Sequence, residues 1–248
     1  MKTMTLAERL IVAADFKTID PGLEGNCRLV RKEVLKLASS LRGTGVCLKV
    51  NSALRACGYD LIDEIHSRGL KVFADLKLFD IGETLSTDGL FLREVKPDLL
   101  TVVCSAGVSA LQMLKAELPN TEVLGVTVLT SLKKEDVQEM YGGSIEEAVS
   151  LFAMIALNGK ADGLIASPKE AEMLRARFEN ALTINTPAIR PTWAIVAGDD
   201  QNPDRIMTPE KAIKAGADRI IVGRPIVRDK NPYDAVMRTI EEIARATA

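Results

Sequence analysis

Short apolar runs recur along the chain, and each run is continuous rather than alternating with polar residues. Eight such runs can be read: Leu10–Ala14, Val46–Val50, Lys71–Leu76, Leu99–Cys104, Glu122–Leu129, Gly163–Ala166, Leu182–Ile184 and Arg219–Val222. Continuous runs rich in Val, Ile and Leu are typical of parallel strands that are buried on both faces. The pattern therefore predicts eight parallel strands.

Amphipathic stretches separate most of these runs and predict helices, among them Leu61–Arg68, Ile145–Leu157 and Ala235–Ala244. Eight strands that alternate with helices indicate an α/β chain folded as a (β/α)8 TIM barrel. The length of 248 residues is usual for one such barrel, so residues 1–248 are expected to form a single domain. The alternative is an open doubly wound sheet, which should carry a GxGxxG motif after its first strand, and no such motif is present.

Composition narrows the class of protein. Hydrophobic residues make up 47% and charged residues 27% of the chain, as in ordinary globular proteins, and the net charge of −2 lacks the basic excess of a nucleic-acid binder. No apolar run approaches the length of a membrane span, and the apolar run near the start is too short for a signal peptide. We therefore expect a cytoplasmic protein that acts on small molecules, with no nucleic-acid or membrane partner.

Cysteine and histidine usage argues against a metal site. The four cysteines show no CxxC spacing, which favours reduced thiols in the core, and the single histidine, His66, lies on an apparently helical stretch. One histidine rules out a two-histidine metal site and a histidine-based triad. We expect neither a metal nor a cofactor.

Charged residues gather where the second and third strands end, which is the end of a barrel that carries the chemistry. They are Lys49, Asp75, Lys77 and Asp80. Residues two apart on a strand point to the same side, so Asp75 and Lys77 should project together. Two cations and two carboxylates can neutralise one another when buried, so the set is either a catalytic array or a structural ion-pair network at the barrel rim.

A second polar cluster follows the seventh and eighth strands. Arg190 and Gln201 lie after the seventh strand, and Gly223 and Arg224 directly follow the eighth. Barrels often hold a phosphate group there, through backbone amides and a bidentate arginine. The cluster therefore indicates a phosphorylated substrate, and the alternative is that both arginines are solvated loop residues.

The order of these motifs resembles the bacterial branch of the orotidine 5′-phosphate decarboxylase family. The resemblance rests on Lys49 and the run Asp75-Leu76-Lys77-Leu78-Phe79-Asp80, followed by Ile81-Gly82-Glu83-Thr84. Further matching landmarks are Asp15, Leu129-Thr130-Ser131, Ile189-Arg190-Pro191, Gln201 and Gly223-Arg224-Pro225. They span nearly the whole chain.

The resemblance implies a cofactor-independent decarboxylation of orotidine 5′-phosphate to uridine 5′-phosphate, the last step of pyrimidine nucleotide synthesis. Lys77 would deliver a proton to C6 of the pyrimidine, and Asp75 would lie against the departing carboxylate. Lys49 and Asp80 would complete the charge network. Asp80 would reach into the site of a neighbouring subunit, which implies a homodimer.

The resemblance also implies a set of substrate contacts. Asp15 and Thr84 would hold ribose hydroxyls, with Lys49 nearby. Thr130 and Ser131 would contact the nucleotide. The phosphate would be bound by Arg190, Gln201, Gly223 and Arg224.

Three positions depart from the family's usual pattern. Gly82 stands where proline is usual, Ala188 where glycine is usual, and Cys104 where a histidine is common. A glycine at position 82 could loosen the turn that aims Asp80, and an alanine at position 188 affects the backbone before Arg190.

Three other functions stay open. Magnesium-dependent sugar-phosphate decarboxylases and synthases share the DxKxxD strand, but carry a metal-binding glutamate on the second strand, where a cation such as Lys49 would repel Mg²⁺. A phosphate-binding isomerase barrel would not need this Lys-Asp-Lys-Asp array. A non-catalytic nucleotide-binding barrel should show damage among those four residues, and all are intact.

Overall fold

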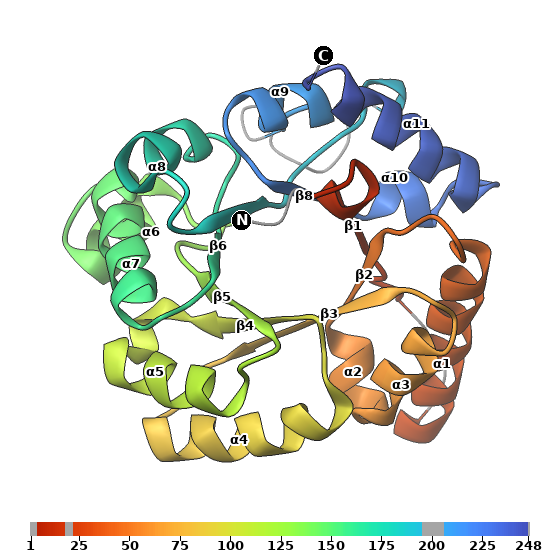
Figure 1. The fold of residues 1–248 in the computed structure, drawn as a ribbon, viewed down its shortest axis with the longest axis horizontal. Helices are drawn as coiled ribbons and strands as arrows, with labels where there is room; N and C mark the ends of the chain where they lie inside the picture. The colour runs from red at the N-terminus through yellow and green to blue at the C-terminus, as the bar shows by residue number, and fades with distance from the viewer. Residues whose placement is uncertain (1–3, 18–21, 195–205, 248) are drawn as a thin grey trace.

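Eight parallel strands close into a barrel in sequence order, with β8 hydrogen-bonded to β1. The computed structural model describes residues 4–17, 22–194 and 206–247 (Figure 1). The strands are β1 (Leu10–Ala13), β2 (Cys47–Val50), β3 (Lys71–Leu78), β4 (Leu99–Val103), β5 (Glu122–Val126), β6 (Gly163–Ile165), β7 (Thr183–Thr186) and β8 (Arg219–Val222). The predicted TIM barrel and all eight predicted strands are confirmed.

Helices surround the barrel as a ring (Figure 1). They are α1 (Leu23–Ser40), α2 (Ser52–Cys57), α3 (Asp60–His66), α4 (Gly82–Val95), α5 (Val108–Glu117), α6 (Lys134–Tyr141), α7 (Ile145–Asn158), α8 (Ala171–Phe178), α9 (Pro209–Lys214), α10 (Arg224–Val227) and α11 (Pro232–Ala244). Among the described residues, short 3-10 helices occupy Ala7–Arg9, Cys104–Ala106 and Thr192–Ala194. The strand–helix alternation expected from the sequence is thus present, with extra helices after β2, β5 and β8.

Two strands differ by more than one residue in length from the apolar runs that predict them. The third run stops at Leu76, but β3 continues to Leu78 because this final residue pairs with Val102 of β4 after a shift in register. The fifth run continues to Leu129, but β5 ends at Val126. Hydrophobicity alone does not mark the point where pairing with a neighbour stops.

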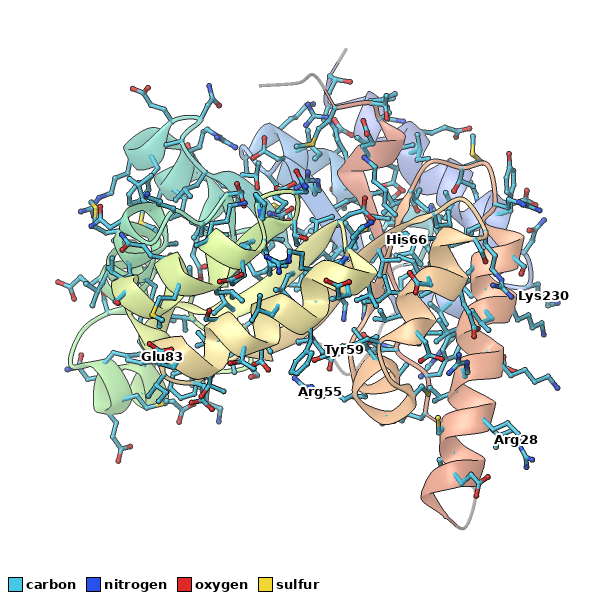
Figure 2. The ribbon with its side chains drawn as sticks, turned by 60° about the horizontal axis from the view of Figure 1, so that its bottom comes forward. Arg28, Arg55, Tyr59, His66, Glu83 and Lys230 are labelled. Atoms are coloured by element: carbon cyan, nitrogen blue, oxygen red, sulfur yellow. The ribbon has the colours of Figure 1, made fainter. Side chains whose placement is uncertain are left out.

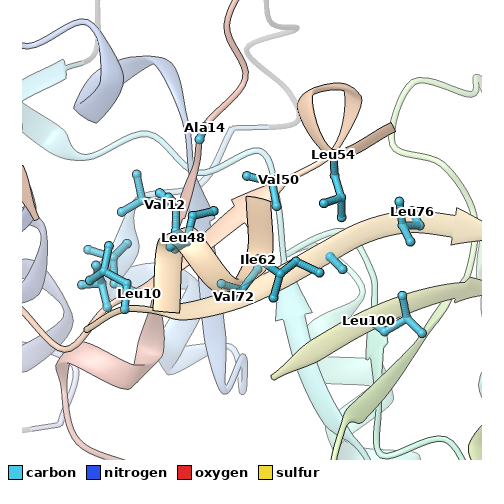
Figure 3. Close-up of a cluster of buried hydrophobic side chains, with 14 of the residues drawn as sticks. Leu10, Val12, Ala14, Leu48, Val50, Leu54, Ile62, Val72, Leu76 and Leu100 are labelled. Carbon is cyan, nitrogen blue, oxygen red and sulfur yellow. The ribbon is translucent and has the colours of Figure 1, made fainter. Parts of the chain in front are cut away.

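Alternation along each strand builds two layers of core. Side chains that point outward pack against the helices, among them Leu10 and Val12 of β1, Leu48 and Val50 of β2, and Leu100 of β4 (Figure 3). The intervening residues fill the barrel interior: Ile11, Ala13, Cys47, Phe73, Leu99, Leu124 and Ile221. Because the period is two, the next inward positions after Cys47, Phe73 and Leu99 are Lys49, Asp75 and Thr101. Polar residues therefore begin where the apolar filling of the interior ends.

At the opposite end of the barrel, three aspartates each link two neighbouring strands, and all three do so in the same way. Asp98, Asp162 and Asp218 each stand directly before an even-numbered strand. Their carboxylates accept hydrogen bonds from the backbone N–H groups of Val72, Val123 and Ile184 on the preceding strands, at 2.8, 2.7 and 2.7 Å. We call each such contact an aspartate clamp.

In each clamp the aspartate also pairs with a basic side chain, which comes from the helix that precedes the odd-numbered strand. His66 of α3 lies 3.0 Å from Asp98, Lys115 of α5 lies 2.7 Å from Asp162, and Arg175 of α8 lies 2.5 Å from Asp218. His66 is therefore part of a structural pair and lies away from the end of the barrel where the helices begin (Figure 2). Burial by itself would raise the pKa of Asp98, but the hydrogen bonds from His66 and Val72 outweigh burial and lower that pKa.

Removal of a clamp should destabilise the barrel. Asp218→Ala leaves the Ile184 N–H and the Arg175 guanidinium without their carboxylate partner, and we expect the free energy of unfolding in urea to fall by about 1–3 kcal/mol. The matched control is Glu210→Ala, which removes an exposed ion pair with Lys214 on α9 and should have a much smaller effect. Equal losses in the two variants would contradict a structural role for the clamp.

Candidate active site

A cavity of about 890 Å³ opens at the carboxyl end of the barrel. Its wall carries the basic side chains of Lys17, Lys49, Lys77, Arg190, Arg224 and Arg228 and the carboxylates of Asp15 and Asp75. Among the described residues that line the cavity, six cations against two anions give a net positive charge, although the chain as a whole has a net charge of −2. Such a cavity attracts an anionic ligand.

Asp75 lies at the centre of the charged residues. Its Oδ2 atom accepts a hydrogen bond from Lys49 Nζ at 3.1 Å, and its Oδ1 atom accepts one from Lys77 Nζ at 2.7 Å. Lys49 Nζ also lies 3.3 Å from an oxygen of Asp15. The structure therefore brings together Asp15, Lys49, Asp75 and Lys77, and Asp75 and Lys77 project together as the strand alternation predicts.

The two ammonium groups keep the buried Asp75 carboxylate ionised. Only 6% of the residue is exposed, and burial by itself raises the pKa of its carboxyl. The charges and hydrogen bonds of Lys49 and Lys77 outweigh burial and hold this pKa below its ordinary value. The site thus presents a fixed negative charge with a proton donor on each side.

Asp75 and Lys77 lie on an irregular segment of β3. Ala74 is paired with Leu100 of β4, but Leu78 is paired with Val102, so four steps along β3 correspond to two along β4. Within this bulge Lys77 has a φ of 48°, a conformation that costs a non-glycine residue about 1–3 kcal/mol. Arg55 of α2 donates a hydrogen bond to the Leu76 carbonyl, and Figure 2 labels Arg55 at the end of the molecule where the helices begin.

Two side chains near Asp75 are missing from the sequence prediction. Asn51 follows β2 and lines the cavity, and its amide nitrogen lies 3.4 Å from Asp75 Oδ2. Thr101 of β4 is fully buried, and its hydroxyl donates to Asp75 Oδ1 at 3.0 Å. Asn51 could have been found by its place directly after a strand, and Thr101 by the inward alternation from Leu99.

Asp80 and Thr84 do not lie with the other candidate residues in this chain. Both are exposed at the start of α4, and neither lines the cavity. The Asp80 carboxylate accepts a hydrogen bond from the N–H of Ile81 at 2.7 Å. Large apolar side chains flank it, since 63% of Phe79 and 70% of Ile81 are exposed.

Thr130 and Ser131 differ in position. Thr130 lines the cavity, whereas Ser131 is exposed and does not line it. The chain leaves the barrel after β5 ends at Val126, so the residues that follow are placed by a loop rather than by strand alternation.

Arg190, Gly223 and Arg224 line the part of the cavity formed after β7 and β8. Arg190 is buried, and its backbone N–H donates to the Met207 carbonyl at 3.0 Å, next to an isolated bridge between Ile189 and Met207. Arg224 begins the short helix α10. Gln201, the other predicted phosphate contact, lies outside the described residues.

The three departures from the family pattern have structural explanations. Ala188 has a φ of 63°, so the backbone adopts here the left-handed conformation that glycine favours. At Gly82 a Cβ atom would lie 2.4 Å from the Sδ atom of Met113, so the side chain of Met113 occupies the space that a proline would need. Cys104 is fully buried and faces Gly125, and burial raises the pKa of its thiol to about 12, which marks it as an unreactive core residue.

Residues 4–17, 22–194 and 206–247 contain neither a cluster of metal ligands nor a single helix that could span a membrane. No group of three or more His, Cys, Asp or Glu side chains within those ranges could hold a metal ion. No single helix in the same ranges is long and apolar enough to cross a membrane, although the bent pair α6 and α7 has the required length and composition.

Glycine at position 188 should relieve backbone strain. The left-handed conformation costs alanine about 1 kcal/mol, which glycine would not pay. The greater conformational freedom of glycine in the unfolded chain offsets part of this relief, so Ala188→Gly should raise the free energy of unfolding by about 0.5 kcal/mol. The control is Ala176→Gly on the exposed face of α8, which should lower it by about 1 kcal/mol. Urea denaturation measures the free energy of unfolding of both variants. A similar decrease in both would contradict backbone strain at position 188.

Comparisons with known proteins agree with the geometry. The model of the "Orotidine 5'-phosphate decarboxylase / HUMPS family" matches residues 8–239. An orotidine 5′-phosphate decarboxylase from Pseudomonas syringae is 35% identical over 243 residues, covering 95% of this chain and 97% of the relative. The enzyme of that name from Nitrobacter winogradskyi is 36% identical over 242 residues, covering 96% and 94%. The crystal structure of orotidine 5′-phosphate decarboxylase from Lactobacillus acidophilus superimposes with a TM-score of 0.72 and 26% identity, covering 95% of this chain and 99% of that one. The chain belongs to the orotidine 5′-phosphate decarboxylase family.

Proposed function

We propose that this chain converts orotidine 5′-phosphate to uridine 5′-phosphate and CO₂, as a carboxy-lyase of pyrimidine nucleotide synthesis. The observation that carries the proposal is the buried Asp75 carboxylate held between Lys49 and Lys77 in a positively charged cavity. The full-length relatives described above carry the name of this enzyme. The substrate is a phosphate ester with an additional carboxylate, so its charge complements the cavity.

The proposed mechanism begins with binding at two ends of the cavity. Arg190 and Arg224 bind the phosphate as guanidinium donors, and the amide of Gly223 adds a backbone donor. Asp15 and Lys49 hold ribose hydroxyls. The phosphate is remote from the reacting carbon, so its binding energy is available to force the pyrimidine carboxylate against Asp75.

The chemical step then relieves the repulsion between two carboxylates. The bond between C6 and the carboxylate carbon breaks, CO₂ leaves, and the electron pair stays on C6. The ammonium of Lys77 stabilises that charge and donates its proton to C6, which leaves a neutral amine that regains a proton from solvent. Lys49 stays charged and keeps Asp75 ionised.

A magnesium-dependent sugar-phosphate reaction fits this site less well. The ammonium of Lys49 lies 3.1 Å from Asp75 Oδ2 and occupies the position in which a cation would approach that carboxylate. A bound Mg²⁺ ion would have to displace the Lys49 ammonium, and it would then be repelled by the Lys77 ammonium on Asp75 Oδ1.

We further propose that the active unit is a homodimer. Phe79, Ile81 and Phe91 are 63%, 70% and 62% exposed; Phe79 and Ile81 lie just before α4, and Phe91 lies further along that helix. An apolar surface of this kind beside Asp80 is explained when a second copy of the chain covers it. In this arrangement Asp80 and Thr84 complete the site of the partner, and each site is composite.

Lys77→Ala tests the proton donor. Decarboxylation, followed as the loss of ultraviolet absorbance of orotidine 5′-phosphate with EDTA present, should fall by at least about 10³-fold, because both the proton and the stabilising charge are removed. The matched control is Lys71→Ala, which removes an exposed lysine at the other end of β3 and should leave turnover near that of the native chain. Retained activity in Lys77→Ala, or loss of native activity in EDTA, would refute the proposal.

Mixing two inactive variants tests the shared site. Asp80→Ala and Lys77→Ala should each be inactive alone. In an equal mixture that is allowed to exchange subunits, half of the dimers carry one chain of each kind and one fully native site, so about a quarter of native activity should return. A mixture that stays inactive after demonstrated subunit exchange would show that Asp80 does not act across an interface.

A further inference from the structure

Thr101 on β4 contacts both members of the Asp75–Lys77 pair through one oxygen atom. The backbone N–H of Lys77 donates to Thr101 Oγ1 at 2.9 Å, and Thr101 Oγ1 donates to Asp75 Oδ1 at 3.0 Å. The residue is fully buried and does not line the cavity. It therefore cannot touch a ligand there and can act only through the residues that it holds.

The bulge in β3 explains why a side chain is needed at this point. Between the pairs Ala74–Leu100 and Leu78–Val102, three residues of β3 face the single residue Thr101 of β4. A bulge leaves backbone groups without their regular partners in the ladder. The hydroxyl of Thr101 takes the place of a ladder carbonyl for the N–H of Lys77, at the one residue of this strand that has a positive φ.

The hydroxyl has a single proton, and the geometry fixes its destination. Because Thr101 Oγ1 accepts the N–H of Lys77, its own proton is directed to Asp75. A hydroxyl that donates to a carboxylate favours the ionised form of that carboxylate. Valine would fill the same volume without a polar group to bury, so packing alone does not require threonine here.

We propose that Thr101 is a positioning residue for the decarboxylation: it fixes Asp75 in its ionised, inward orientation and holds the backbone from which Lys77 reaches the substrate. This inference rests on the function proposed above. One hydroxyl sets the distance between the carboxylate that repels the leaving group and the ammonium that delivers the proton. Both groups are then held in place before the substrate binds.

Kinetics of Thr101→Val test the proposal. We expect kcat to fall about 10–100-fold with KM changed less than about threefold, because Arg190 and Arg224 still bind the phosphate. The acid limb of the rate profile should move to higher pH, since Asp75 loses a hydrogen bond that favours its charged form and its pKa rises. Thr101→Ser keeps the hydroxyl and should restore both kcat and the acid limb.

The matched control is Thr239→Val, which removes the hydroxyl of an equally buried threonine on α11. It should change neither kcat nor the acid limb. If Thr101→Val does not fold, Thr101→Cys replaces the hydroxyl with a weaker donor of similar size and should show the same changes to a smaller degree. Native kcat and an unshifted acid limb in the folded Val or Cys variant would overturn the proposal.

A second measurement does not depend on the reaction. The Asp75 carboxyl carbon, titrated by ¹³C NMR in the ligand-free protein, should show a higher pKa in Thr101→Val than in the native chain or in Thr101→Ser. An unchanged titration would overturn the role of Thr101 whether or not the chain decarboxylates orotidine 5′-phosphate. Failure of the native chain to turn over this substrate, with the NMR shift present, would instead refute the proposed function alone.

Discussion

The buried carboxylate of Asp75 is the constraint on which the rest of the site depends. A lone ionised carboxylate at this depth would be too costly to keep, and it is kept because Lys49, Lys77 and Thr101 all donate to it. Those partners come from β2, β3 and β4, three consecutive strands, so the closed barrel is what brings them within hydrogen-bond distance. In turn, the carboxylate fixes the positions of two ammonium groups that would otherwise repel each other.

Much of this arrangement could be predicted from the sequence because it follows from period-two alternation. Continuous apolar runs predict all eight strands, and the places of Lys49 and Asp75 near the ends of the second and third runs predict that they share one end of the barrel. The inward position of Thr101 follows from alternation after Leu99, but its hydrogen bonds to Lys77 and Asp75 depend on a bulge whose register is set by pairing between strands. Local sequence contains no direct signal of that register.

Other parts of the site could not be predicted for different physical reasons. The position of Ser131 is set by a loop after β5, for which no periodicity applies. Asp80 and Thr84 are exposed and do not line the cavity of their own chain, so strand alternation does not place them relative to a substrate. A Cβ atom at position 82 would meet Met113 on a different helix, a contact between residues 31 positions apart that spacing in the sequence cannot indicate.

The aspartate clamps at the opposite end of the barrel have a consequence for how the chain can be divided. Each clamp joins an odd strand to the even strand that follows it: β3 to β4, β5 to β6, and β7 to β8. The carboxylate, the N–H group and the basic partner of a clamp all lie within one continuous strand–helix–strand segment and the helix before it. Strands β3 to β8 are thus arranged as three adjacent modules that each carry their own electrostatic closure. New chain termini introduced by circular permutation between modules, for example in the connection from β4 to α5, preserve every clamp, whereas termini introduced between β3 and β4 divide one.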